Sequence, residues 1–266
     1  HLSIDDRPRL LHSGDNLEEA MSTQHHPLES RALFKNFGEV TALNGVSLQV
    51  DAGVTAVLGQ NGAGKTTLIR CALGLEQPSA GSVTLFGGLP RKRHSRQRVG
   101  AMLQYTKLPD LLTGRELITL FASYYPEPMS LDEIIALTHI EPFVDKRYKK
   151  LSGGQKRRIQ FAITIVGNPD LVFLDEPTTG LDSEARKVLW DTVRGFAADG
   201  RAIVLTTHYL EEADSLADRI VIMKHGEVIA DADAETIRAG VGGSLIRCET
   251  ATDMETVRAL PACTGA

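Results

Sequence analysis

The feature that most constrains this chain is a glycine-rich loop at residues 59–66, which fits the pattern G-x-x-x-x-G-K-[ST]. The loop follows an apolar run and precedes a predicted helix at 65–73, which Gly74 would end. Its glycines let successive backbone N–H groups point at phosphate oxygens, and the helix N-terminus adds partial positive charge. We expect Lys65 to reach the β- and γ-phosphates and the hydroxyl of Thr66 to hold Mg²⁺. A plain glycine-rich turn is the alternative, but the strand–loop–helix context favours a phosphate-binding loop.

A second motif is the apolar run at 171–174, which ends in two adjacent acids, Asp175 and Glu176. Neighbouring side chains of a strand point to opposite sides, so the two carboxylates are expected to have different roles. Asp175 suits the coordination shell of magnesium, whereas Glu176 can orient or deprotonate an attacking water. A plain acidic turn explains this pair alone equally well, but does not explain its combination with the phosphate loop.

A third motif, Leu-Ser-Gly-Gly-Gln at 151–155, is a second design for binding an anion. Ser152 is placed to be an N-cap, Gly153 and Gly154 expose backbone N–H groups, and three cations follow at 156–158. The motif has no strand or lysine of its own. We therefore expect it to serve the nucleotide of another subunit.

The pattern between these motifs is typical of an α/β fold with a parallel central sheet. Short strands are predicted at 46–50, 54–58, 82–86, 171–174 and 202–206, and a hairpin is predicted to turn at His225 and Gly226. Residues 113–167 are predicted to be helical with interruptions at prolines, and Asp182 is predicted to cap a helix that ends near Gly200. No internal repeat is visible.

Together the three motifs resemble the ATP-binding cassette (ABC) ATPases, over about residues 31–235. The resemblance implies an α/β P-loop NTPase (RecA-like) core with a parallel sheet, an antiparallel β subdomain and an inserted helical subdomain at about 105–167. It also implies ATP and Mg²⁺ as cofactors, with Thr66, Gln104 and Asp175 as the metal-binding residues.

Further residues take their expected roles from this resemblance. Gln104 is similar to the glutamine of the loop between core and helical subdomain, and His208 to a switch histidine that contacts the γ-phosphate; both join Glu176 as catalytic residues. Asp182 matches the loop that crosses the dimer interface. Phe37 stands where the family has an adenine-stacking aromatic, with a simple core aromatic as the alternative. The implied nucleotide-binding residues are Phe37, Gly59, Asn61, Gly62, Ala63, Gly64, Lys65, Thr66, Thr67, Ser152, Gly153, Gly154, Gln155 and Asp182.

Composition and charge exclude several classes of protein. With 29 Lys and Arg against 34 Asp and Glu, the chain has a net charge of −5, and no nucleic-acid partner is expected. The basic stretch at 91–98 has no interleaved aromatic and is predicted to be a solvated loop. The 3 scattered cysteines indicate a reducing compartment, and the apolar runs are too short to span a bilayer.

Three further features of the sequence indicate the subclass of ABC ATPase. There are no heptads between Lys65 and Ser152, there is one cassette, and there are no membrane spans. The chain thus resembles the stand-alone ATPase subunits of two-component bacterial exporters of the daunorubicin-resistance and ABC-2 type. This implies a homodimer formed on ATP binding, a separate polytopic permease, and a cytoplasmic position on the inner face of the cell membrane. Export of drugs or other hydrophobic compounds is expected, although the transported substrate and the direction of transport stay open.

The stretch at 105–116, with Leu108, Leu111 and Leu112, is predicted to bind a short cytoplasmic helix of the permease. One alternative function is a soluble ABC-type ATPase module that acts on the ribosome or on nucleic acid without a membrane partner. A P-loop kinase for a small acceptor is another, but it does not explain residues 151–155.

The two ends of the chain differ from its middle. Residues 1–30 hold six acids and two arginines with little apolar periodicity, and a mobile tail is expected there. Residues 236–266 are expected to be a C-terminal extension, the truncated beginning of a small domain.

Overall fold

The computed structural model describes residues 25–104 and 106–240. Tyr105 and most of the two terminal segments discussed above lie outside this part. The chain divides into two compact units, residues 1–234 and 235–266. The last described helix, α8 (Ala234–Gly240), begins at this boundary.

A six-stranded sheet forms the centre of the first unit, with the strand order β5-β6-β7-β3-β8-β9. All neighbouring strands are parallel except the β8–β9 hairpin, which turns at His225 and Gly226 as predicted. The strands are β3 (Gly53–Leu58), β5 (Val99–Met102), β6 (Leu171–Asp175), β7 (Ala202–Thr207), β8 (Arg219–Lys224) and β9 (Glu227–Asp233). Strands β6 and β7 are buried along their whole length, which explains their unbroken apolar runs.

A second, antiparallel sheet has the order β2-β1-β4. Its strands are β1 (Leu28–Phe37), β2 (Val40–Val50) and β4 (Ala80–Leu85). β1 starts three residues before the expected domain boundary at residue 31, because Leu28 is buried and pairs with both Val50 and Leu85. Helix α1 (Lys65–Ala72) packs its apolar face, including Leu68 and Ile69, into the core shared by the two sheets.

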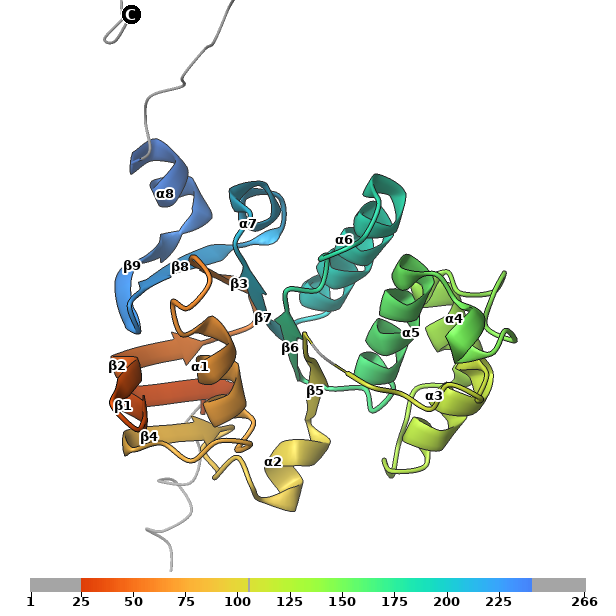
Figure 1. Cartoon of the computed structure of the whole chain (residues 1–266), viewed down its shortest axis with the longest axis horizontal. Coiled ribbons are helices and arrows are strands. Elements are labelled where there is room, and N and C mark those ends of the chain that lie inside the picture. The colour runs from red at the N-terminus through yellow and green to blue at the C-terminus, as the bar shows by residue number, and fades with distance from the viewer. Residues whose placement is uncertain (1–24, 105, 241–266) are drawn as a thin grey trace, which may run out of the picture. The chain divides into compact units, whose positions relative to one another are not determined.

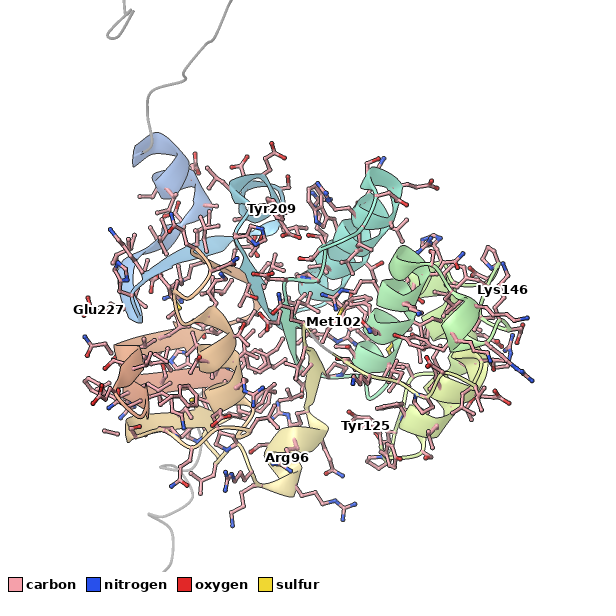
Figure 2. All side chains as sticks on the ribbon, in the orientation of Figure 1. Arg96, Met102, Tyr125, Lys146, Tyr209 and Glu227 are labelled. Carbon is pink, nitrogen blue, oxygen red and sulfur yellow. The ribbon has the colours of Figure 1, made fainter. Side chains whose placement is uncertain are left out.

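The helical elements between β5 and β6 have their own apolar core. They are α3 (Gly114–Ala122), α4 (Leu131–Thr138), the 3₁₀ turn η1 (Tyr148–Lys150) and α5 (Gly153–Ile165). Figure 1 shows α3, α4 and α5 grouped on one side of the six-stranded sheet, away from β1, β2 and β4. Thr113, Ser130 and Ser152 cap the three helices by accepting backbone N–H bonds from the residue three positions later. Met102, labelled in Figure 2, belongs to a buried apolar core that includes side chains of β6, α5 and α6 (Ser183–Ala198).

The architecture confirms the predicted α/β fold, with one correction at the basic stretch. Residues predicted to form a solvated loop there include a short helix, α2 (Arg93–Gln97), in which Ser95 is buried under the β4 end. Arg96 nevertheless points outward, as does Lys146 between α4 and η1 (Figure 2). Within the described residues no helix is both long and apolar enough to cross a membrane.

Candidate functional site

The glycine-rich loop connects β3 to α1 at the carboxyl edge of the central sheet. Gly64 is the N-cap of α1 with φ of 103°, a conformation that strains other residues, and a Cβ there would lie 2.6 Å from the Ala42 carbonyl oxygen. Lys65 is 5% exposed, and its ammonium donates to the carbonyl oxygens of Gly59 (2.7 Å) and Gln60 (3.2 Å). The loop thus presents backbone N–H groups and a buried cation at one helix N-terminus. Thr67 follows in the first turn of α1, next to Thr66.

The carboxylate of Asp175 lies at the end of β6, fully buried. Its Oδ1 accepts hydrogen bonds from the hydroxyls of Thr206 (2.5 Å) and Thr66 (3.3 Å). Its Oδ2 is buried without a hydrogen-bond partner among the described residues. The structure therefore brings together Thr66 and Asp175, two of the three predicted metal-binding residues. Thr206 was not predicted, although its place at the end of an apolar strand, two residues before His208, is a usable signal.

Glu176 is the centre of a group of predicted site residues. Its Oε2 accepts a hydrogen bond from the Gln104 amide (3.1 Å), and its Oε1 lies 3.3 Å from Nδ1 of His208. The Lys65 ammonium is 3.8 Å from the same Oε1. Because these residues come from four segments far apart in sequence, the cluster is a product of the fold rather than of local structure.

The backbone of Glu176 turns sharply out of β6, with φ of 47°. Its N–H donates to the carbonyl oxygen and to the hydroxyl of Thr206, both at 3.1 Å. Its carbonyl oxygen accepts a hydrogen bond from Arg157 of α5 at 2.8 Å. A positive φ is uncommon for a residue with a side chain and has to be held by its surroundings. The same turn separates the Glu176 carboxylate from that of Asp175.

Arg157 is a residue of this site that the sequence did not single out beyond its place among three cations. Burial lowers the pKa of its guanidinium, while the charges of Asp175, Tyr148 and Glu176 oppose that shift. This partly buried guanidinium places positive charge near Asp175 at the end of β6 and near Glu176, which follows it.

Residues 151–155 form the predicted helix start. The Ser152 hydroxyl accepts from the N–H of Gln155, and the Gln155 side chain accepts from the N–H of Ser152, which is a reciprocal capping box. A Cβ at Gly153 would meet nothing within 4 Å, and one at Gly154 would make ordinary contacts with Leu181 and Ala185. The N-terminal N–H groups of α5 are thus accessible.

Asp182 and Phe37 also lie outside the Glu176 cluster. Asp182 is the N-cap of α6, where its carboxylate accepts from the N–H of Ala185 (2.8 Å). Phe37 ends β1 with 46% of its surface exposed, and the Lys35 ammonium lies 4.7 Å from its ring centroid. No hydrogen bond or ion pair found within residues 25–104 and 106–240 joins Asp182 or Phe37 to Glu176.

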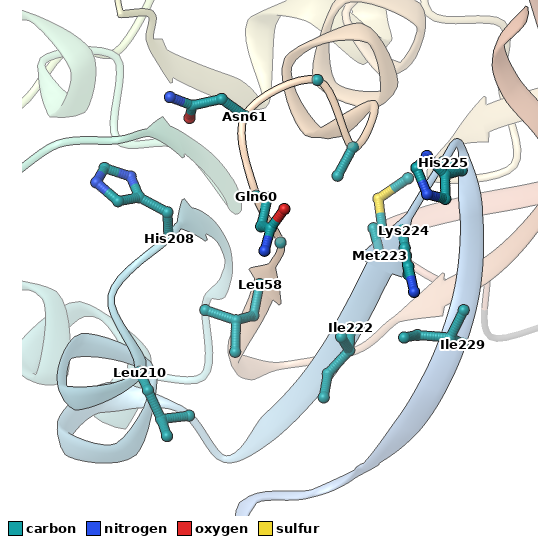
Figure 3. Close-up of a pocket in the computed structure, with 13 residues that line it drawn as sticks. Leu58, Gln60, Asn61, His208, Leu210, Ile222, Met223, Lys224, His225 and Ile229 are labelled. Atoms are coloured by element: carbon teal, nitrogen blue, oxygen red, sulfur yellow. The ribbon is translucent and has the colours of Figure 1, made fainter.

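Two hollows flank the cluster. The first, of about 610 Å³, is lined by Gly59, Asn61, Gly62 and Ala63 of the loop together with His208. Figure 3 shows Asn61 and His208 on one side of this pocket and Lys224 and His225 on the other. The second hollow, of about 660 Å³, lies between the Glu176 cluster, from which Gln104 lines it, and the 151–155 motif, from which Gly153 lines it. Its lining includes Gln104, Lys107, Leu108, Gly153, Arg157 and Thr179.

Residues 43–179 match the family described as ABC transporter. The Nod factor export ATP-binding protein I of Burkholderia lata is 40% identical over 213 residues, which cover 77% of this chain and 70% of that protein. The daunorubicin resistance ATP-binding protein DrrA3 of Streptomyces coeruleorubidus is 39% identical over 80% of this chain and 70% of that protein.

Among solved structures, the dimeric structure of MJ0796, a bacterial ABC transporter cassette, has a TM-score of 0.69 at 25% identity, covering 78% of this chain and 98% of that one. The family match spans more than half of the chain, and both curated relatives bear names of ATP-binding proteins. These matches confirm the resemblance drawn from the three motifs: the chain belongs to the ABC transporter family, as an ATP-binding ATPase subunit.

Proposed function

We propose that this chain hydrolyses ATP to power a two-component exporter of drugs or other hydrophobic compounds. The main support for ATP hydrolysis is the Glu176 cluster, in which Gln104 and His208 hold the carboxylate beside the phosphate-loop lysine. The names of the two curated relatives, one for Nod factor export and one for daunorubicin resistance, support the direction of transport and the class of substrate.

In this reaction Glu176 positions and deprotonates the attacking water. The water oxygen bonds to the γ-phosphorus, the bond from that phosphorus to the β–γ bridging oxygen breaks, and the water proton passes to the carboxylate. Gln104 and His208 each contact a different oxygen of this carboxylate, which orients it before substrate binds. Lys65 exchanges its bonds to two loop carbonyls for stronger charge-assisted bonds to the phosphates.

The donor set at the end of β6 fits a magnesium ion, which prefers hard oxygen ligands and keeps several waters. The buried Oδ2 of Asp175 has no hydrogen-bond partner among the described residues, so it is available to the ion or to its water. Gln104 donates its amide nitrogen to Glu176, which leaves the amide oxygen as a ligand. Thr66, Asp175 and Gln104 would hold the ion, which neutralises charge on the β- and γ-phosphates.

The accessible helix start at 152–154 supports a dimer with two composite sites. Its backbone N–H groups would bind the nucleotide held by Lys65 of a second copy, and the reverse contact would follow from two-fold symmetry. Asp182, at the start of α6, would lie in the loop that crosses this interface. Phe37 would stack on the adenine, for which its exposed ring is suited. The dimeric cassette that this fold resembles supports such an assembly.

The membrane partner would dock beside Gln104. Leu111 is 65% exposed, whereas Leu108 and Leu112 pack partly against the helical core, so Leu111 offers the accessible apolar contact. Lys107 and Leu108, which line the second hollow, precede Leu111 closely in the sequence. A short cytoplasmic helix of a polytopic permease would bind here and hold the chain on the inner face of the cell membrane.

The test replaces Glu176 with glutamine, which keeps the size of the side chain and removes the base. Glu176→Gln should lower ATP hydrolysis by about 10²- to 10⁴-fold and leave ATP binding intact. Glu141→Gln, a change at an exposed glutamate of the helical part, is the matched control and should retain full activity. ATP hydrolysis within twofold of wild type in Glu176→Gln would refute the catalytic assignment.

A further inference from the structure

Arg157 connects two parts of the proposed machinery that act on different nucleotides. It lies on α5, in the turn that follows Ser152 and Gly154. The start of this helix is proposed to contact the nucleotide of the second copy, whereas Glu176 acts on the nucleotide bound by its own chain. One side chain between them is therefore placed to link the two composite sites.

The guanidinium of Arg157 bonds to the main chain at both catalytic segments. Its Nη2 donates to the Glu176 carbonyl oxygen at 2.8 Å. Its Nη1 lies 3.4 Å from the carbonyl oxygen of Leu103, the residue before Gln104, and 3.1 Å from Oε1 of Gln160. Gln104 and Glu176 in turn bond to each other through their side chains at 3.1 Å. These bonds connect Arg157, Gln104 and Glu176 in one closed network, which fixes the Gln104 amide and the Glu176 carboxylate relative to α5.

The energetics indicate that these contacts hold Arg157 in place. The Arg157 side chain is partly buried, and this burial lowers the pKa of its guanidinium. No carboxylate among the described residues lies within ion-pair distance of it, and its Nη1 and Nη2 groups donate to two carbonyl oxygens and one amide oxygen. A charge buried in this way is costly unless its hydrogen bonds are kept. A displacement of α5 would therefore carry the Glu176 backbone with it or break these bonds.

We propose that Arg157 is a positioning residue that sets the orientation of Glu176 and Gln104 according to the position of α5. The positive φ of Glu176 is a strained conformation, and the Arg157 bond to its carbonyl oxygen stabilises that turn. The inference rests on the proposed function, because it takes Glu176 as the base and the start of α5 as a contact to the second nucleotide. It adds that contact between the start of α5 and the nucleotide of one composite site orients Glu176, the base of the other site.

The test uses mixed dimers of the full chain, purified through two different tags, in which only one chain can hydrolyse ATP. That chain, X, retains Glu176, and its partner, Y, carries Glu176→Gln. Arg157→Gln on X should lower the rate of ATP hydrolysis by about 10- to 100-fold, the range for losing a hydrogen bond to a charged donor. The KM for ATP should stay within about threefold, because the phosphate loop is untouched.

The position of the substitution separates positioning from a general structural role. The loss should occur only when Arg157→Gln is on the chain that retains Glu176. An equal loss from either chain would overturn the proposal, since it would mean that Arg157 supports the helix start that faces the other nucleotide, or folding as a whole. Rates unchanged from both chains would overturn it as well.

Two controls keep this outcome distinct from failure of the proposed function. Arg194→Gln on X should leave the rate unchanged, because Arg194 lies on α6 and donates to Asp191 and to the Ser215 carbonyl oxygen. Gly154→Asp on Y places a carboxylate at the start of α5 and should abolish hydrolysis at X if the sites are composite. Full activity in Gly154→Asp would refute the composite dimer, whereas the Arg157 result on X still decides whether this residue positions the base.

Discussion

The hydroxyl of Thr206 is expected to stabilise the fold through the buried carboxylate of Asp175. Thr206 donates to Asp175 Oδ1 at 2.5 Å, and both side chains are fully buried. Thr206→Val keeps the shape of the side chain and replaces the hydroxyl with a methyl group. The Glu176 N–H, which also donates to this hydroxyl, keeps its bond to the Thr206 carbonyl oxygen. Because Oδ2 of Asp175 has no partner among the described residues, the buried carboxylate would keep the Thr66 bond at 3.3 Å as its remaining hydrogen bond.

The magnitude follows from the kind of bond that is lost. Hydrogen bonds to charged groups contribute about 1.5–3 kcal/mol, so the free energy of unfolding should fall by about 2 kcal/mol. For a domain of this size that lowers the Tm by about 4–8 °C. Urea unfolding followed by circular dichroism, together with calorimetry, measures both quantities.

The neighbouring threonine of β7 provides the comparison. Thr207 is equally buried, but its hydroxyl accepts only from the N–H of Tyr209 (3.0 Å) among the bonds of the described residues. Thr207→Val should therefore cost about 1 kcal/mol or less, the value for a neutral bond. Equal losses in the two variants, or a loss below about 0.5 kcal/mol in Thr206→Val, would refute the argument that the charge of Asp175 sets the cost.

Three further predictions concern the loop, the antiparallel sheet and the docking surface. Lys65→Ala should weaken ATP binding by about 10- to 100-fold in a fluorescence titration, and an unchanged Kd would contradict its role. Gly81→Ala, where a Cβ would lie 1.9 Å from the Ala32 carbonyl oxygen at a φ of 78°, should destabilise the fold by at least about 2 kcal/mol in urea. Gly195→Ala, in open space on α6, should be neutral or stabilising, and similar costs for both would refute the steric argument. Leu111→Glu should reduce recovery of the chain with membranes and uncouple transport while soluble ATPase activity persists; normal membrane binding would exclude this surface.

Much of the local structure could be predicted because it depends on short-range sterics and hydrogen bonds. The N-caps Ser152 and Asp182 follow from side chains that bond to N–H groups three residues later. The left-handed Gly64 and the helix after it follow from the glycine pattern of the loop. The boundaries at Leu28 and at α2 were less well predicted, because pairing with Val50 and Leu85 and the burial of Ser95 depend on distant segments.

The sequence by itself determined the phosphate loop, the acidic strand end, the second helix start and, through them, the family. It did not determine that Glu176 would bond to Gln104 and His208, or that Arg157 and Thr206 would hold its backbone. Those contacts depend on the strand order, which places β6 between β5 and β7 and so brings the ends of three strands together. Strand order is set by packing across the whole sheet rather than by any local pattern. The tertiary structure alone therefore decided which residues surround the base.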